Sequence, residues 1–196
     1  LPNLERSDSL GLGCDYIDRM EKRRPIEVGV SGVVGEVRST VIDLLNPPPT
    51  RVVDDVWGIG CDLRYAVTER FGLQGELYKG RGLGTYSGTI GQIVNTTTRQ
   101  TIESEGGWGE IYYYFNPCVH THCGASFDDV DEADVAIGQR TYNQAIFANL
   151  MWDVTNNFQV ACEVSHWKTN YRSAVPAVFF GDNEGMVYHF RMQYSF

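Results

Sequence analysis

Strict alternation of apolar and polar residues is the feature that most constrains the fold of this chain. Successive side chains of a β-strand point to opposite faces of a sheet, so each alternating segment predicts a strand with one apolar face. The clearest segments are residues 56–67, 142–154, 158–165 and 186–196. Weaker alternation predicts four more strands, at residues 26–37, 73–82, 108–115 and 119–128.

The connections between these strands alternate in length. Short turns are predicted at residues 68–72, 116–118 and 155–157. Long links are predicted at residues 39–54, 83–106, 129–140 and 172–185. Short turns on one side and long loops on the other are typical of outer-membrane barrels, whose strands of ~9–11 residues cross the bilayer at a tilt. The sequence therefore predicts an all-β fold: an antiparallel up-and-down transmembrane β-barrel of about eight strands over residues 26–196.

Residues 1–25 form a separate N-terminal segment, for which one extra strand and a periplasmic or loop region both remain open. The start, Leu-Pro-Asn-Leu-Glu, has neither an initiator Met nor a signal peptide, so we expect a mature product or a fragment.

Composition excludes several classes of protein. The formal net charge of −9 over 196 residues argues against a nucleic-acid partner. No uncharged apolar run reaches the ~18 residues that predict a membrane helix. The five cysteines are an odd number, which argues against a complete disulfide framework.

The C-terminal strand carries a second signal. Its last apolar positions are Phe190, Met192, Tyr194 and Phe196. This ending resembles the final strand of bacterial outer-membrane barrels, and the resemblance implies that the barrel-assembly machinery reads it. Aromatic residues also gather near other strand ends, as they do at membrane interfaces. The alternative is a soluble protein whose last core strand ends the chain.

Three longer segments carry a closer resemblance: "LRYAVTERFGLQGELYKGRGLGTY", "GGWGEIYYYFNPCVHTHCGASFDD" and "GQRTYNQAIFANLMWDVTNNFQVACEVSHWKTNY". The stretch from Trp57 to Phe196 resembles the C-terminal part of porin-like barrels of planctomycete-type bacteria, which are related to trimeric substrate-gated porins. The resemblance implies a sixteen-strand barrel of which this chain supplies the C-terminal half, a homotrimer as one option, and no catalytic residue.

Length leaves two architectures open. Eight strands can close alone into a narrow barrel filled by side chains, whereas sixteen leave a water-filled channel. In either case the alternation predicts which side chains face lipid or a neighbouring subunit: Trp57, Ile59, Leu63, Tyr65, Ile146, Leu150, Trp152, Val160 and Val164. The predicted pore-lining residues are Asp62, Arg64, Glu76, Glu110, Glu163, His189, Arg191 and Gln193.

These features predict an integral protein of the bacterial outer membrane that lets small hydrophilic solutes diffuse passively. Its expected partners are the bilayer and small solutes, with cations favoured by the acidic charge. The main alternative is a narrow non-conducting barrel with a structural, adhesion or binding role through its external loops. A third is a soluble ligand-carrying barrel.

Four other patterns in the sequence suggest different functions. Cys118, His120, His122 and Cys123 suggest a zinc or copper site, but ligands alternating along an extended strand do not converge on one ion, so no metal and no cofactor is expected. A Cys118–Cys123 disulfide is disfavoured for the same reason.

A hydrolase built on Ser165 with His166 fails because neighbouring strand residues point to opposite faces, although His189 remains a candidate partner. The Gly58–Gly60 and Gly80–Gly82 patterns follow strands rather than open helices, so they do not indicate a nucleotide site. Residues 128–134 are acidic enough for calcium but lack the EF-hand glycine and glutamate, which favours a solvated external loop. The protein is not expected to be an enzyme.

Overall fold

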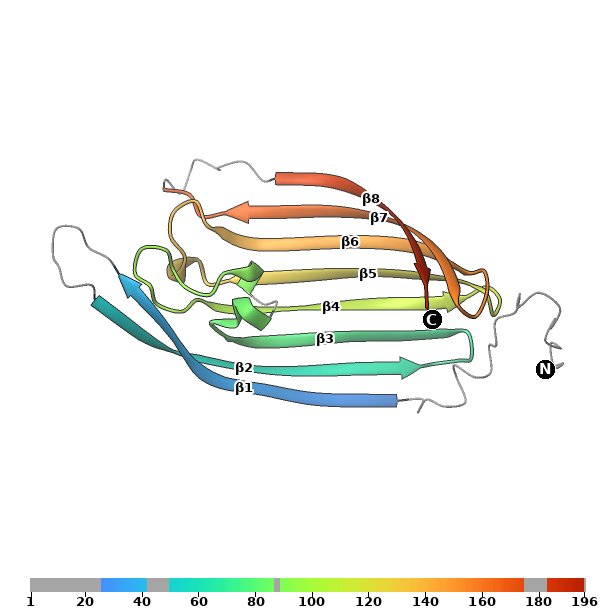
Figure 1. Cartoon of the computed structure of the whole chain (residues 1–196), viewed down its shortest axis with the longest axis horizontal. Coiled ribbons are helices and arrows are strands. Elements are labelled where there is room, and N and C mark those ends of the chain that lie inside the picture. The colour runs from blue at the N-terminus through green and yellow to red at the C-terminus, as the bar shows by residue number, and fades with distance from the viewer. Residues whose placement is uncertain (1–25, 42–49, 87–88, 175–182, 196) are drawn as a thin grey trace.

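The computed structural model describes residues 26–41, 50–86, 89–174 and 183–195, and this part of the chain forms one eight-stranded antiparallel sheet. Each strand pairs with the next in chain order (Figure 1). The strands are β1 (Ile26–Val41), β2 (Thr50–Ala66), β3 (Phe71–Arg81), β4 (Glu103–Tyr114), β5 (Val119–Val130), β6 (Arg140–Asp153), β7 (Phe158–Tyr171) and β8 (Asn183–Tyr194). The predicted all-β, up-and-down antiparallel arrangement of eight strands is confirmed.

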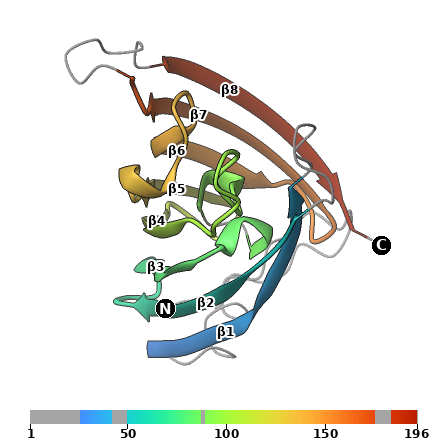
Figure 2. The same ribbon diagram turned by 90° about the vertical axis from the view of Figure 1, so that its left-hand side faces the viewer.

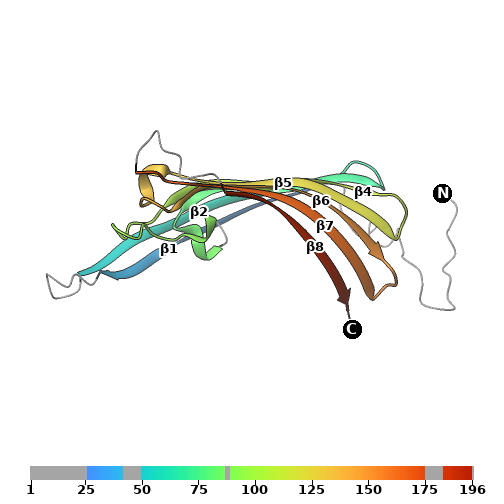
Figure 3. The same cartoon turned by 90° about the horizontal axis from the view of Figure 1, so that it is seen from above.

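The sheet is strongly curved and open. Among the described residues β1 pairs only with β2, and β8 only with β7, so the two are edge strands. Figures 2 and 3 show the strands bending around a concave side. Two short 3-10 helices, η1 (Leu83–Tyr86) and η2 (Thr89–Gly91), lie within that concavity (Figure 2). A third, η3 (Glu132–Asp134), lies between β5 and β6.

The short turns were predicted correctly, and each has a local cause. The Thr68 hydroxyl accepts hydrogen bonds from the backbone N–H groups of Arg70 and Phe71, with N to Oγ1 distances of 3.2 and 2.9 Å. The Asn116 side-chain oxygen also accepts hydrogen bonds from two backbone N–H groups that follow it. The Thr155 hydroxyl accepts two such hydrogen bonds in the third turn. Side-chain oxygens at the first positions of these turns therefore replace the missing sheet hydrogen bonds.

The long-loop ends of the strands extend further than predicted. β1 continues to Val41 and β2 begins at Thr50, so half of the predicted link at 39–54 is paired strand. β4 begins at Glu103 and β8 at Asn183, again inside the predicted links. Polar residues at these ends hid the strands in the sequence, because backbone pairing needs no apolar side chain.

A small buried core lies at the long-loop end of the sheet. It joins Ile90, Ile102, Val130 and Val135, and so connects the segment before β4 to the segment after β5. Two of these, Ile102 and Val135, have no exposed surface. The core fixes the two segments to each other and leaves the rest of the sheet as a single layer.

The predictions for residues 1–25 and for Phe196 concern positions outside the described residues. None of the helices in the described ranges is long and apolar enough to cross a membrane.

Candidate functional site: the two faces of the sheet

The eight predicted pore-lining residues all lie on the concave face. Strand register shows this directly, because paired residues share a face: Asp62 pairs with Glu76, and Glu163 pairs with His189. Arg64 and Glu110 each pair with Gln74. Arg191 and Gln193 follow His189 at alternate positions of β8. The structure thus brings together on one face the charged residues that the alternation pointed to.

Side chains at the short-turn end of this face form a hydrogen-bonded network across three strands. Glu110 lies at its centre: Gln74 Nε2 donates to Glu110 Oε1 at 2.6 Å, and His122 Nδ1 lies 2.8 Å from the same oxygen. His122 Nε2 lies 3.1 Å from Nδ1 of His120. Because Glu110 and His122 are largely buried, this network holds β3, β4 and β5 in register through polar contacts.

The network continues towards β7 and β8. His120 Nε2 lies 3.6 Å from Asp153 Oδ2, and Gln159 Nε2 donates to Asp153 Oδ1 at 2.7 Å. Arg191 in turn donates to the side-chain oxygen of Gln159. Farther along, His189 Nδ1 lies 3.5 Å from Glu163 Oε1. Acidic and basic groups alternate along this row, so the concave face is polar from β3 to β8.

This arrangement accounts for the cysteine and histidine pattern. His120 and His122 lie on the concave face, whereas Cys123 pairs with Ala148 on the opposite, convex face. Cys118 is disulfide-bonded while Cys123 is a free thiol, so these two cysteines are not joined. Within the described ranges no three His, Cys, Asp or Glu side chains come together as a metal-binding group.

Residues 82–86 and 89–102, here called the inner loop, cover part of the concave face. Leu83 lies in a niche over Gly58 and Gly80: a Cβ added to either glycine would come within 2.8 and 2.7 Å of a Leu83 methyl group. One glycine from each G-x-G pattern therefore makes room for Leu83. Side-chain bulk at these positions would push the inner loop away from the sheet.

Two carboxylates attach the inner loop to the sheet. Asp54 Oδ2 accepts hydrogen bonds from the Thr101 backbone N–H at 2.7 Å and from the Thr101 hydroxyl at 2.9 Å. Asp128 Oδ2 accepts from the N–H of Ile90 at 2.6 Å. Ile90 has a φ of 51°, a left-handed conformation that costs energy for a β-branched residue and that these contacts maintain.

The acidic segment 128–134 differs from the solvated loop that was expected. Asp128 and Asp129 belong to β5. Asp134 Oδ2 accepts the backbone N–H of Glu103 at 3.0 Å and lies 3.6 Å from Arg81 Nη2. Asp128 and Asp134 thus hold strands and loops together, and the sequence could not reveal that, because their partners are distant in the chain. Asp129, Asp131 and Glu132 are exposed, as expected for a solvated acidic segment.

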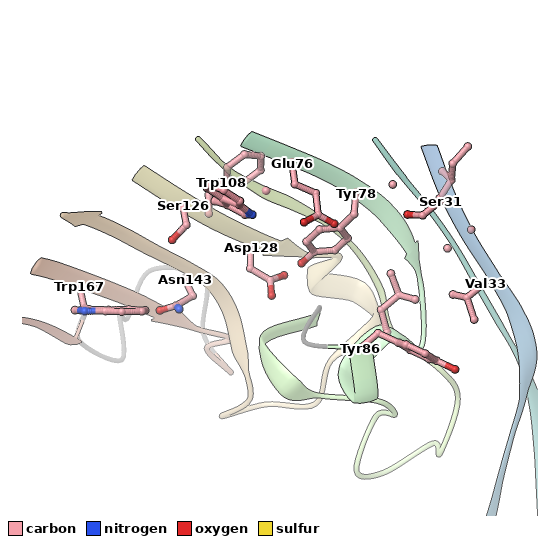
Figure 4. Close-up of a pocket in the computed structure, with 17 residues that line it drawn as sticks. Ser31, Val33, Glu76, Tyr78, Tyr86, Trp108, Ser126, Asp128, Asn143 and Trp167 are labelled. Carbon is pink, nitrogen blue, oxygen red and sulfur yellow. The ribbon is translucent and has the colours of Figure 1, made fainter. Parts of the chain in front are cut away.

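A cavity of about 720 Å³ remains between the inner loop and the sheet. Figure 4 shows Glu76, Tyr78, Asp128 and Tyr86 around its centre, with Trp108 on one side and Trp167 on another. Sequence reasoning assigned none of the tryptophans to the concave face. The only available signal was that Trp108 and Trp167 fall on the polar side of their strands' alternation.

The convex face is apolar and exposed. Its exposed side chains include Val28, Val30, Val34, Trp57, Ile59, Leu63, Leu77, Ile111, Ile146, Leu150, Trp152, Tyr188, Phe190 and Met192. The free cysteines Cys61, Cys123 and Cys162 are exposed on the same face. All nine residues expected to face lipid or a neighbour lie here as well. These exposed apolar side chains of the convex face are here called the convex belt. A large exposed apolar surface marks a site of contact with protein or with a membrane.

The belt has a charged or polar upper boundary at the long-loop end. We follow the convex face of each strand from its short-turn end to the first charged, amide or imidazole residue. In strand order, these residues are Glu36, Asp55, Lys79, Glu105, Asp129, Gln144, His166 and Glu184. This boundary descends from β2 to β7 and steps back by two residues at β8, where His166 pairs with Met186 and Lys168 pairs with Glu184. Lys79 pairs with Ile59, four residues beyond Asp55 towards the short turns, and Gln144 pairs with Phe127, two residues beyond Asp129.

The lower, aromatic boundary descends in the same direction. Tyr65 on β2 pairs with Leu73 on β3, and Phe71 lies two residues beyond Leu73 towards the short turns. On the other side of the sheet Val160 pairs with Trp152, and Phe158 extends two residues beyond it. The belt therefore keeps its height while crossing the strands obliquely. From Trp57 to Tyr65 it runs ~26 Å along β2, or about 20 Å in height if the strand tilts by ~40°.

The hydrolase alternative finds no support in the geometry. Ser165 lies on the concave face and His166 on the convex face, where His166 Nε2 is 3.8 Å from Glu184. The Ser165 hydroxyl accepts a hydrogen bond from Trp167 Nε1 at 2.9 Å, and His189 is paired with Glu163 instead.

Comparison with known proteins gave no match, whether with protein-family models, with curated proteins or with solved structures.

Proposed function

We propose that this chain forms part of the wall of a porin-like channel in the bacterial outer membrane, through which small hydrophilic solutes diffuse passively. The observation that carries the proposal is the oblique apolar belt on the convex face, bounded by charged residues on one side and aromatic residues on the other. Tilted strands crossing a slab of lipid need this pattern, whereas an apolar face that packs on another protein layer has no reason to follow one oblique band.

The concave face supports passage of solutes. It carries the network around Glu110 and the pair Glu163–His189, with charged side chains that lipid would not tolerate. A wide channel leaves such groups in contact with water, as the interior of a porin does.

The open edges of the sheet, at β1 and β8, are the places where further strands of the channel wall can pair. Unpaired strand edges are costly in lipid, because backbone groups there have no water to bind. We therefore propose that further strands pair with β1 and β8, giving the sixteen-strand barrel that the sequence resemblance implies. Insertion by the barrel-assembly machinery and association into trimers belong to the same proposal.

Planar-bilayer recording tests the function. The purified protein, reconstituted in its full natural length, should give stable conductance steps that scale with salt concentration. Incorporation without any conductance would instead favour the narrow, non-conducting alternative, in which the inner loop and side chains fill the interior and the external loops act. Failure to enter lipid at all would contradict both.

A further inference from the structure

The cavity under the inner loop has a regular floor that strand register defines. One row of paired residues crosses the concave face as Glu76, Trp108, Ser126, Ala145 and Trp167. The two indoles thus lie three strands apart, roughly 14 Å at ~4.8 Å per strand, with only Ser126 and Ala145 between them. Trp108, Ser126 and Trp167 line the cavity, whereas Ala145 is buried. The small side chains in this row leave a trough between the two indoles.

The next row adds polar groups beside the trough. It contains Tyr78, Gly106, Asp128 and Asn143, paired in that order. Figure 4 shows Glu76 and Asp128 reaching into the same space from different strands, with Asn143 beside Trp167. Both tryptophans are about two-fifths exposed, so their rings are accessible within the cavity. The Trp167 indole N–H already donates to Ser165, which leaves its ring as the surface available to a ligand.

The charge of the cavity is one-sided. Its lining includes two carboxylates, Glu76 and Asp128, and no Lys, Arg or His among the described residues. Asp62 pairs with Glu76 and adds a third acidic group at its margin. Aromatic faces attract cations through the ring quadrupole, and carboxylates form short charge-assisted hydrogen bonds with ammonium and guanidinium groups.

We propose that this cavity binds small organic cations that lack a carboxylate, such as a guanidine and an amine joined by a short alkyl chain. The guanidinium contacts Glu76, because Asp128 already accepts the Ile90 N–H, while the alkyl chain lies along the trough between Trp108 and Trp167. A ligand carboxylate would face these acidic groups and be rejected by like-charge repulsion. This inference rests on one part of the proposed function, namely that the concave face is in contact with water.

Binding to the full chain in detergent, measured by isothermal titration calorimetry, tests the proposal without requiring conductance. Agmatine is the probe and arginine its matched control, because arginine adds only the carboxylate. Agmatine should bind saturably, and arginine about tenfold or more weaker. Equal binding of the two, or no saturable agmatine binding, overturns the proposal.

Two variants identify the site. Glu76→Gln and Trp108→Phe should each weaken agmatine binding, Glu76→Gln by about tenfold. Glu105→Gln makes the same charge change on the convex side, where Glu105 lies 3.2 Å from Lys79, and should leave binding unchanged. If Trp108→Phe weakens agmatine binding and Glu76→Gln does not, the Glu76 carboxylate does not hold the cation, and the proposal fails. Conductance without agmatine binding would contradict this inference but not the proposed channel function.

Discussion

Asp54 on β2 holds Thr101 at the end of the inner loop through two hydrogen bonds to one carboxylate oxygen, with distances of 2.7 and 2.9 Å. The two residues are 47 positions apart in the chain. This contact joins the inner loop to β2, whereas Asp128 joins it to β5, so the loop is attached at two separate strands.

Asp54→Ala should therefore loosen the inner loop. Hydrogen bonds to a charged group contribute about 1.5–3 kcal/mol each, and we expect a loss of about 2–3 kcal/mol in unfolding free energy, since water replaces part of the contact. Amide hydrogen exchange at residues 99–102 should accelerate. Asp55→Ala removes the neighbouring exposed carboxylate and should change neither quantity; equal effects of the two variants would contradict the role of Asp54.

Leu63 lies well inside the convex belt, so Leu63→Arg should destabilise the protein in lipid. Arginine near the midplane of a barrel costs ~2–4 kcal/mol, and the cost falls towards the interfaces. Asp55→Arg, on the same face of β2 at the charged boundary, should cost less than about 1 kcal/mol. Folding equilibria in lipid vesicles measure both costs. A cost for Leu63→Arg no greater than that for Asp55→Arg would show that Leu63 does not face lipid.

Glu110→Ala should destabilise the concave face because it leaves the buried side chains of His122 and Gln74 without their shared acceptor. The unmet polar groups should cost about 1–3 kcal/mol. Glu105→Ala, which breaks an exposed ion pair with Lys79, should cost at most ~1 kcal/mol. Chemical unfolding of both variants gives the comparison, and similar losses would mean that the network adds no stability.

If the barrel conducts, cations should be favoured. The chain carries a net charge of −9, and a narrow low-dielectric mouth concentrates counter-ions. Reversal potentials under a salt gradient measure this preference. It should weaken at high salt, where the screening length falls from ~10 Å at 0.1 M to ~3 Å at 1 M. A preference for anions would contradict the prediction.

The sequence was sufficient for the strands and for their two faces, because alternation records directly which side chains face which side. Thus Leu63 and Asp62 were assigned to opposite faces without any structure. The ends of β1 and β2 were missed, since Val41, Val52 and Val53 stand there among polar residues without an alternating pattern. Strand pairing then extended both ends beyond the alternating segments.

Other features depend on contacts between distant residues. The inner loop turns inward because Asp54 and Asp128 bind its backbone and because two glycines make room for Leu83. The network at Glu110 and the trough between Trp108 and Trp167 require the register of four neighbouring strands. Alternation specifies a residue's face but not its partner on the next strand, so neither feature could be derived from the sequence.

The most direct test of the central claim, that the convex belt faces lipid, uses the chain's own free thiols. Cys61, Cys123 and Cys162 are exposed on that belt. After reconstitution in vesicles they should resist a charged, membrane-impermeant thiol reagent while reacting with a lipid-soluble maleimide. A cysteine placed on the concave face by Gln193→Cys should react with the charged reagent. If the three native thiols react with that reagent as fast as the introduced cysteine does, the belt is in water and the account is wrong.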